Sequence, residues 1–237
     1  MVYRLAIAPS QIHQDRIDLT PQQQHYLLRV LRLKTGDRFI AMDGQGRAWI
    51  AQIEAVGASI VEEIAVDTEL PVAVTLITAL PKGSGYEQVI RCCTELGVTT
   101  FLPVRSDRTI IKPSDNKVQR WRKIATEAAE QSERQIVPAI LNPISFTEAI
   151  AQTETAADKY ICVARHQVFS LAQCLRQKPA KDLVIATGCE GGWTDNEVER
   201  AIAAGYQPVT LGRRILRAVT APIVASSLVA STLEGNF

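Results

Sequence analysis

The sequence has almost no net charge: Lys plus Arg total 26 and Asp plus Glu total 25 in 237 residues, a formal charge of +1. A protein that coats nucleic acid with its whole surface is therefore excluded, and any binding of a polyanion must depend on a local basic patch. Heptad and Gly-X-Y repeats are absent, which excludes a fibre. Hydrophobic residues at 46% and charged residues at 22% are typical of a globular protein and exclude a disordered chain.

Long apolar runs and paired cysteines are also absent. The longest uncharged run near the C-terminus, residues 218–233, has 16 residues and includes Pro222, three serines and two threonines, whereas a membrane span needs roughly 20 mostly apolar residues. The N-terminus lacks the apolar core of a signal peptide. The five cysteines form no C-x-x-C pair, and neither they nor the three histidines have the spacing of metal ligands. We therefore expect a soluble, cytoplasmic protein with reduced thiols, no membrane association and no bound metal.

Residues 1–70 have the pattern of a small β domain. Asp43 and Gly44 lie between two strand-like runs and predict a hairpin. Thr20 and Pro21 predict the start of a short helix that ends before Gly36. Several short strands within about 70 residues favour a β-barrel.

From residue 71 onward, predicted strands and helices alternate. The first run, residues 72–79, is apolar almost throughout, as expected of a buried strand in a parallel sheet. This alternation predicts an α/β fold with helices on both faces of the sheet, and ligands bind such sheets at the carboxyl ends of the strands. Further strands are expected at 99–104, 159–163, 182–186 and 209–211, and helices at 86–96, from 117, at 171–176, 194–204 and 218–233.

Residues 187–192, TGCEGG, follow a predicted buried strand. Three glycines leave backbone groups open to close approach. The turn lacks the Gly-Lys-Ser/Thr ending of a Walker A loop, and Glu190 suits a positively charged ligand better than a phosphate. The alternative interpretation is a tight turn with Glu190 in solvent.

Residues 211–222 form a second turn, in which Gly212 precedes Arg213, Arg214 and Arg217. The first two arginines suit an ordinary solvated loop. Arg217 lies between apolar residues, where an unpaired charge is costly to desolvate. We therefore expect Arg217 to have a partner, either a carboxylate or a substrate.

Residues 105–123 form a basic run, with seven Lys and Arg against two Asp, which leaves a local charge of +5. A solvated helix face and a surface for an RNA backbone are both consistent with it. In the second interpretation, phosphates contact Arg105, Arg108 and Arg122, and the N-terminal helix extends the patch through Arg29 and Arg32.

In this order and at this spacing, the two turns resemble the RsmE-type family, the small-subunit (16S) ribosomal RNA uridine-N3 methyltransferases of the SPOUT superfamily. The family pattern is I-G-P-E-G-G followed by L-G-x-R-I-L-R-x-E-T-A, and this chain has TGCEGG at 187–192 and LGRRILRAVTA at 211–221. Residues 30–37, 43–44, 94–98 and 130–138 also resemble family segments, so the resemblance spans nearly the whole chain.

The resemblance implies a PUA-like RNA-binding β-barrel at residues 1–70 and a SPOUT methyltransferase domain with a deep trefoil knot at 71–237. It implies S-adenosyl-L-methionine (SAM) as cofactor, small-subunit ribosomal RNA or the assembled subunit as substrate, and a homodimer whose sites are each completed by the partner. Arg217 and Arg134 would orient the uracil or stabilise its anion, and Glu190 would accept a proton or fix the geometry. The expected cofactor-binding residues are Gly188, Glu190, Gly191, Leu211, Gly212, Ile215, Leu216 and Thr220.

Three positions depart from the family pattern. Cys189 replaces the proline of G-P-E-G-G, Val219 replaces the acid of R-x-E-T-A, and Arg91 or a neighbour stands where many members have a lysine. Cys189 is interpreted more simply as a small residue in a tight turn than as a nucleophile. Two other functions stay open: a SPOUT methyltransferase with another RNA target and, because of Val219, a non-catalytic RNA-binding or ribosome-assembly protein.

Overall fold

A computed structural model describes residues 3–165, 167–176 and 181–234 of the chain. The chain divides into two compact units, which we call the N-terminal and C-terminal units. The N-terminal unit comprises Met1–Glu69 and Ala129–Val137, and the C-terminal unit comprises Leu70–Ala128 and Pro138–Phe237. The N-terminal unit thus differs from a single run of residues 1–70 because it includes a segment from later in the chain.

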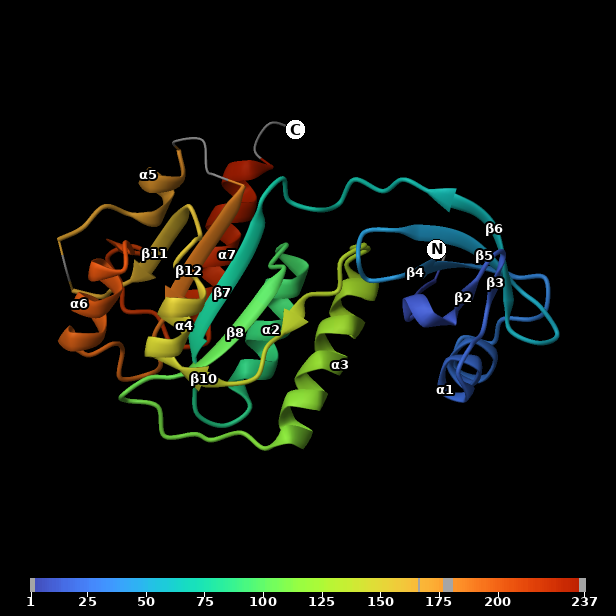
Figure 1. The fold of residues 1–237 in the computed structure, drawn as a ribbon, viewed down its shortest axis with the longest axis horizontal. Helices are drawn as coiled ribbons and strands as arrows, with labels where there is room; N and C mark the ends of the chain where they lie inside the picture. Colours follow the sequence, from blue (N-terminus) through green and yellow to red (C-terminus); the bar gives the residue numbers. More distant parts are fainter. Residues whose placement is uncertain (1–2, 166, 177–180, 235–237) are drawn as a thin grey trace. The chain divides into compact units, whose positions relative to one another are not determined.

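The N-terminal unit is built on a six-stranded sheet in the order β1-β4-β5-β6-β3-β2 (Figure 1). All neighbouring strands are antiparallel except β1 and β4. Asp43 closes the predicted hairpin between β4 and β5, because its Oδ1 accepts hydrogen bonds from the backbone N–H groups of Gln45 and Arg47 at 2.7 and 3.0 Å. The strands are β1 (Arg4–Ala6), β2 (Ile12–His13), β3 (Arg16–Ile17), β4 (Arg38–Met42), β5 (Ala48–Ile53) and β6 (Ala58–Ile64).

The predicted N-terminal helix is present as α1 (Pro21–His25) followed by a π-helical turn, η2 (Tyr26–Val30). Thr20 and Gln23 cap α1 reciprocally, each side chain bonding to the other residue's backbone N–H. A short 3₁₀ turn, η1 (Pro9–Gln11), links the two edge strands of the sheet. Apolar side chains including Leu27, Phe39 and Ile53 form the core of this unit.

The C-terminal unit has a parallel sheet in the order β10-β8-β7-β12-β11-β13, with the short β9 paired to β8. Every neighbouring pair in this sheet is parallel, as the continuous apolar runs predicted. The carboxyl ends of β11, β12 and β13 therefore lie at the same edge. The strands are β7 (Ala73–Ala79), β8 (Thr100–Arg105), β9 (Ala139–Ile140), β10 (Ile144–Ser145), β11 (Asp158–Cys162), β12 (Asp182–Thr187) and β13 (Gln207–Val209).

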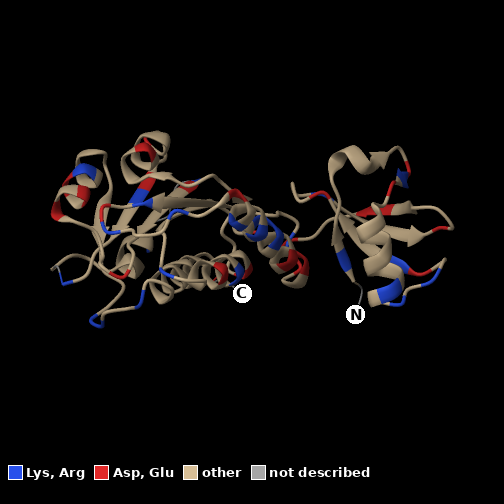
Figure 2. Ribbon diagram, turned by 90° about the horizontal axis from the view of Figure 1, so that it is seen from below, with Lys and Arg blue, Asp and Glu red and all other residues tan. Residues whose placement is uncertain are grey.

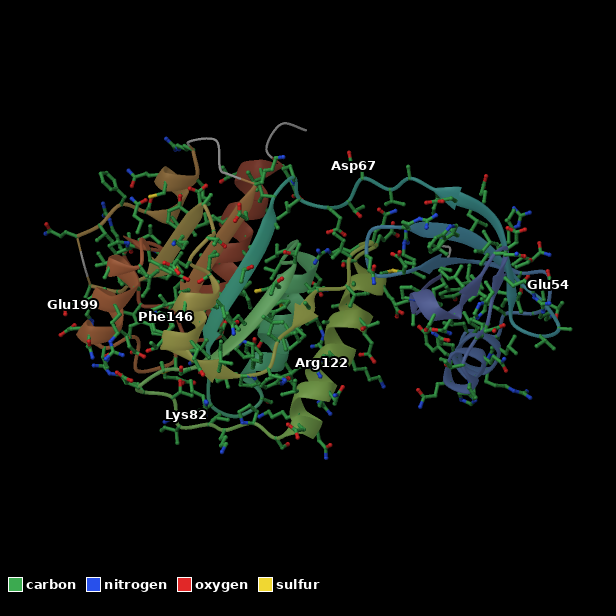
Figure 3. The ribbon with its side chains drawn as sticks, in the orientation of Figure 1. Glu54, Asp67, Lys82, Arg122, Phe146 and Glu199 are labelled. Carbon is green, nitrogen blue, oxygen red and sulfur yellow. The ribbon has the colours of Figure 1, made fainter. Side chains whose placement is uncertain are left out.

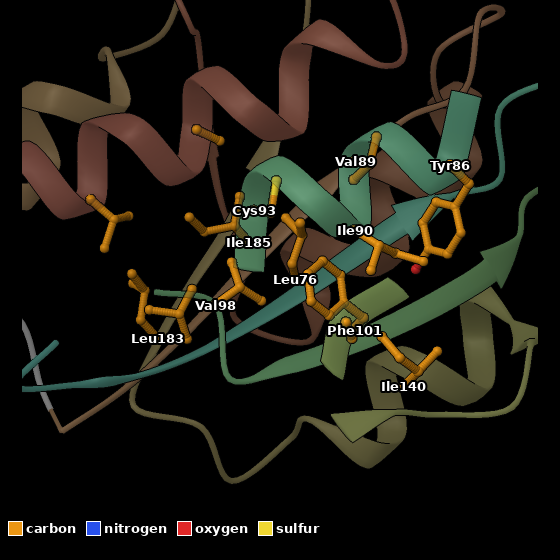
Figure 4. Close-up of a cluster of buried hydrophobic side chains, with 14 of the residues drawn as sticks. Leu76, Tyr86, Val89, Ile90, Cys93, Val98, Phe101, Ile140, Leu183 and Ile185 are labelled. Atoms are coloured by element: carbon orange, nitrogen blue, oxygen red, sulfur yellow. The ribbon is translucent and has the colours of Figure 1, made fainter. Parts of the chain in front are cut away.

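Helices cover both faces of this sheet. Successive side chains of a strand point to opposite faces, so neighbouring strand residues belong to different buried clusters. Leu76 packs with residues of α2 and α7 in one buried cluster, which Figure 4 shows between the sheet and these helices. Ile77 packs with Phe146 and Ala201, from α4 and α6, in the other cluster. The helices are α2 (Gly85–Glu95), α3 (Asp115–Gln131), α4 (Phe146–Gln152), α5 (Leu171–Leu175), α6 (Asp195–Ala203) and α7 (Thr220–Leu233).

The described residues contain no helix that is both long and apolar enough to cross a membrane. All five cysteines are free thiols, and Cys93 and Cys189 are buried.

Candidate active site

A cavity of about 470 Å³ opens at the carboxyl ends of β11, β12 and β13. Three loops, at residues 162–165, 188–195 and 210–216, supply most of its lining, and Val198 of α6, Ala221 of α7 and Arg108 from the loop after β8 complete the wall. The parallel order of the strands brings these loops together, although the chain between them forms α5 and α6 (Figure 1). Both glycine-containing turns therefore face one ligand-sized space.

Most residues expected to bind a cofactor line this cavity. Thr220, the exposed first residue of α7, does not, although the next residue of the helix, Ala221, does. Sequence reasoning missed Cys162 and Val163, which line the cavity from the end of β11. The only sequence signal for these two residues is the end of a predicted strand. The sequence does not show which strands lie beside that strand in the sheet, so it could not place its end at the cavity. The expected residues that line the cavity are Gly188, Glu190, Gly191, Leu211, Gly212, Ile215 and Leu216.

The glycines of the two turns are needed for different reasons. A Cβ on Gly188 would lie 3.1 Å from the Cα of Gly192, so the loop closes on itself there. Gly192 and Gly212 have φ angles of +67° and +124°, which side chains rarely adopt, and a Cβ on either would meet no atom within 4 Å. Open space thus lies beside backbone groups of both turns, as a bound ligand requires.

Glu190 is exposed on the cavity wall. Its Oε1 accepts a hydrogen bond of 2.9 Å from the backbone N–H of Lys82, which lies in the loop between β7 and α2 (Figure 3). The carboxylate therefore ties two loops together. The structure shows no hydrogen bond from a described residue to the other carboxylate oxygen, Oε2.

Arg217 follows the second turn, and its side chain is exposed and does not line the cavity of its own chain. Within the described residues, its guanidinium has no hydrogen-bond or ion-pair partner, so the carboxylate that the sequence led us to consider is not there. Its backbone carbonyl accepts from Thr220 and Ala221 N–H at 2.9 Å and begins α7. Arg217 is thus held at a fixed backbone position with its charge unneutralised.

Val219, where the family has an acid, packs against the start of α2. A Cβ on Gly85 would lie only 2.6 Å from Cγ2 of Val219. Val219 also packs against the larger buried cluster. The valine therefore contributes to helix packing and is not among the residues that line the cavity.

Arg134 belongs to the N-terminal unit, and its side chain is only 2% exposed. Its Nη2 donates to Oε2 of Glu69 at 2.6 Å, and its Nε donates to the same oxygen at 3.1 Å. Glu69 Oε1 also accepts from the backbone N–H groups of Gln135 and Ile136, both at 3.0 Å. The structure thus gives the buried Arg134 a partly buried carboxylate partner and does not place it among the residues that line the cavity.

Several side chains of the basic run have partners within the fold. Figure 2 shows where Lys and Arg, and Asp and Glu, lie along the ribbon. Arg120 forms an ion pair of 2.8 Å with Glu87, and Lys123 lies 3.6 Å from Glu127. Arg122 donates to the carbonyl of Ile140 and to Asn142 Oδ1. Arg108 donates to two carbonyls of the 188–193 loop. The remaining predicted RNA contacts, Arg105, Arg29 and Arg32, are exposed, and the last two belong to the N-terminal unit.

Comparison with known proteins finds two matching family models, an RNA methyltransferase domain over residues 68–230 and an RNA methyltransferase PUA domain over residues 19–62. Ribosomal RNA small subunit methyltransferase E of Synechocystis sp. is 51% identical, over 99% of this chain and 79% of that protein. The protein of the same name from Bacillus subtilis is 31% identical over 98% of this chain and 96% of its own length. A crystal structure of ribosomal RNA small subunit methyltransferase E from Neisseria gonorrhoeae, bound to S-adenosyl methionine, matches with a TM-score of 0.87, 33% identity and 96% coverage of each chain.

Proposed function

This chain belongs to the RNA methyltransferase family that includes ribosomal RNA small subunit methyltransferase E, and from that premise we propose that it transfers the methyl group of SAM to N3 of a uridine in small-subunit ribosomal RNA. The observation that carries the proposal is that both family turns line one cavity of about 470 Å³. The PUA-like N-terminal unit is proposed to bind the RNA. The relative from Neisseria gonorrhoeae binds the same cofactor.

The residues of the cavity fit SAM. Its volume lies within the range of about 300 to 1,000 Å³ that is common for small-molecule sites. Gly188, Gly191, Leu211, Gly212 and Leu216 line the cavity, and their backbone groups are proposed to hold the adenine and ribose, with Ile215 as an apolar wall. Glu190 supplies a negative charge on the wall, which suits a sulfonium ion. When bound, SAM supplies a methyl group on positively charged sulfur with a good leaving group.

The chain's own residues must prepare the uridine, because N3 carries a proton near neutral pH. Oε1 of Glu190 accepts a hydrogen bond from the backbone N–H of Lys82. The other oxygen, Oε2, is therefore the proposed proton acceptor. Arg217 cannot accept a proton, but its unneutralised guanidinium can donate to O2 or O4 and stabilise the uracil anion. Arg134 forms an ion pair with Glu69 of its own chain, so we assign the anion-stabilising role first to Arg217.

We also propose that the C-terminal unit contains the trefoil knot of the SPOUT superfamily and that the protein is a cytoplasmic homodimer. The position of Arg217 supports the dimer. Its side chain is exposed beside the cavity of its own chain but does not line it. Such a residue can reach substrate in a site shared between two copies.

The test is single-turnover methylation of small ribosomal subunits from a strain that lacks the protein, with the product nucleoside identified by mass spectrometry. We expect N3-methyluridine at one position. Arg217→Ala should lower the rate by on the order of 10²-fold, as for loss of one preorganised donor. SAM affinity should change much less, and Arg217→Lys should restore only part of the rate, because the planar fork is lost.

Other outcomes identify the alternatives. A methylated nucleoside in another RNA would indicate a different target. No SAM binding at millimolar concentration, or methylation seen only in Val219→Glu, would indicate a non-catalytic relative. Full activity of Arg217→Ala would remove Arg217 from the mechanism.

A further inference from the structure

The turn at residues 106–109, after β8, lies against the glycine-containing loop at residues 188–193. We propose that Arg108 is a positioning residue that holds this loop in the shape that binds the cofactor, and that it is not a contact for RNA phosphates. The inference rests on the proposed function only in naming SAM as the ligand of the loop. Arg108 lines the cavity together with the loop that it contacts.

The guanidinium of Arg108 has two backbone acceptors on the loop. Nη1 donates to the carbonyl of Gly191 at 2.5 Å and to the carbonyl of Trp193 at 3.2 Å. These two carbonyls flank Gly192, the residue with a φ of +67°. Hydrogen bonds from a charged donor are about twice as strong as neutral ones. One side chain therefore fixes the backbone on both sides of the turn's most unusual residue.

The stem of Arg108 packs closely against Gly191. A Cβ built on Gly191 would lie 3.0 Å from Cδ and 3.3 Å from Cβ of Arg108. A side chain at this position would push the arginine stem away from the loop. Glycine at position 191 therefore lets the arginine stem lie against the loop, and a Cβ there would shift the stem by a few tenths of an ångström, independently of any ligand.

The turn that carries Arg108 is itself fixed. Ser106 bonds through its backbone N–H and its hydroxyl to Thr109 Oγ1, at 3.1 and 2.9 Å. The backbone N–H of Asp107 donates to Oε1 of Glu197, a residue only 3% exposed, at 2.9 Å. The hydroxyl of Thr194 donates to Oδ2 of Asp107 at 3.0 Å. Arg108 is therefore presented to the loop from a turn anchored at the start of α6, which limits the entropy lost when it binds the carbonyls.

The contacts predict a specific loss of cofactor affinity. Removing a charged hydrogen-bond donor from a pair of carbonyls should weaken SAM binding by about tenfold or more. Lysine at this position keeps the charge, but its ammonium lies one side-chain atom closer to the backbone than Nη1 of Arg108, so Arg108→Lys should recover only part of the affinity. Arg120→Ala is the matched control, since it removes the same side chain from an exposed ion pair with Glu87, a residue that does not line the cavity.

The experiment is calorimetric titration of SAM, without RNA, into the full-length wild type, Arg108→Ala, Arg108→Lys and Arg120→Ala. We expect affinity in the order wild type and Arg120→Ala, then Arg108→Lys, then Arg108→Ala. In steady-state methylation, the KM for SAM should rise in Arg108→Ala while the KM for RNA stays unchanged. Wild-type SAM affinity in folded Arg108→Ala, with a loss of RNA affinity, would overturn the proposal in favour of a phosphate contact.

A second measurement keeps the inference testable if Arg108→Ala folds poorly or if the wild type binds no SAM. Gly191→Ala displaces the same contact from the other side, so its effect should not add to that of Arg108→Ala in the double variant. Amide hydrogen exchange at residues 190–193, measured without ligand, should be faster in Arg108→Lys than in the wild type. Failure of SAM binding in the wild type with faster exchange in Arg108→Lys would contradict the proposed function alone. Unchanged exchange would contradict the role of Arg108.

Discussion

At the scale of single residues, the partner of each arginine decides what its removal should do. Arg134 is buried and its charged atoms lie 2.6 Å from those of Glu69, which is 19% exposed, and removing one partner of a fully buried pair costs about 3 to 5 kcal/mol. Arg134→Ala should therefore lower the free energy of unfolding by about 3 kcal/mol, measured by urea denaturation. Arg4→Ala is the control, because its partner Glu133 is 58% exposed and such pairs contribute only about 0 to 1 kcal/mol.

The same variant tests the role that the family resemblance implied for Arg134. If Arg134→Ala unfolded at the wild-type urea concentration but no longer methylated RNA, the residue would act on substrate, in a site completed by a second copy. A loss of stability with normal turnover of the folded fraction would leave Arg134 with a structural role.

The stability of the protein should depend on pH through the buried thiol of Cys93. Its side chain is fully buried, and burial raises the pKa of its thiol from 9.0 to about 12. Above pH 9 the unfolded chain releases this proton while the folded chain keeps it, so stability should fall as the pH rises from about 9 toward 12. The expected contribution is about 1.4 kcal/mol per pH unit. Urea unfolding between pH 8 and 10.5 should show a shallower pH dependence in Cys93→Ala, and equal slopes in both proteins would contradict the assignment.

At the scale of elements, the sequence predicted those whose signal is local. The apolar run at 72–79, the helix from residue 117 and the helix at 194–204 were all readable, and the structure confirms them as β7, α3 and α6. Strand β13, expected at 209–211, lies at Gln207–Val209. The elements that were missed, β9, β10 and α4, follow one another within residues 139–152. Two of them are two-residue strands that exist only through pairing with β8, which no local pattern encodes.

In the candidate site, too, the features predicted from the sequence were the local ones. The glycine turns are local features of the sequence, and the cavity was found at them. The partners of Arg108 and Arg134 lie 83 and 65 residues away along the chain. A sequence shows that an arginine needs an acceptor but not which distant backbone or carboxylate the fold supplies.

Helices α2 and α7 approach each other through Gly85 and Val219, and this approach can be tested directly. Replacing a helical glycine by alanine usually stabilises a helix by up to about 1 kcal/mol. Here the new Cβ would lie 2.6 Å from Val219 Cγ2, so Gly85→Ala should instead destabilise the protein by about 1 to 3 kcal/mol. In a Val219→Ala background the clash is gone and the same change should be neutral or stabilising. Urea unfolding of the four proteins gives the interaction energy, and strictly additive effects would contradict the close packing of the two residues.

At the scale of the whole molecule, a formal charge of +1 gives little long-range attraction for RNA. Affinity must therefore come from cations that lie together on one surface and are not already paired with carboxylates. Arg105 and Lys112 are exposed in the basic run, and among the described residues neither forms an ion pair. Arg120 and Lys123 belong to the same run but lie beside Glu87 and Glu127.

RNA affinity should therefore depend on whether each cation is already in an ion pair with a carboxylate, and not only on the number of positive charges. The double variant Arg105→Gln/Lys112→Gln should bind a ribosomal RNA fragment more weakly. Its salt dependence should flatten by about 0.7 in the slope of log K against log salt for each phosphate that the protein no longer neutralises. Arg120→Gln/Lys123→Gln removes the same two charges and should leave that slope unchanged, because the carboxylates already neutralise them. Fluorescence anisotropy at several salt concentrations between about 50 and 200 mM measures both slopes. An equal decrease in the salt slope of both double variants would show that paired and unpaired cations of the basic run contribute alike to RNA binding. An unchanged slope in both would show that RNA binds to another surface.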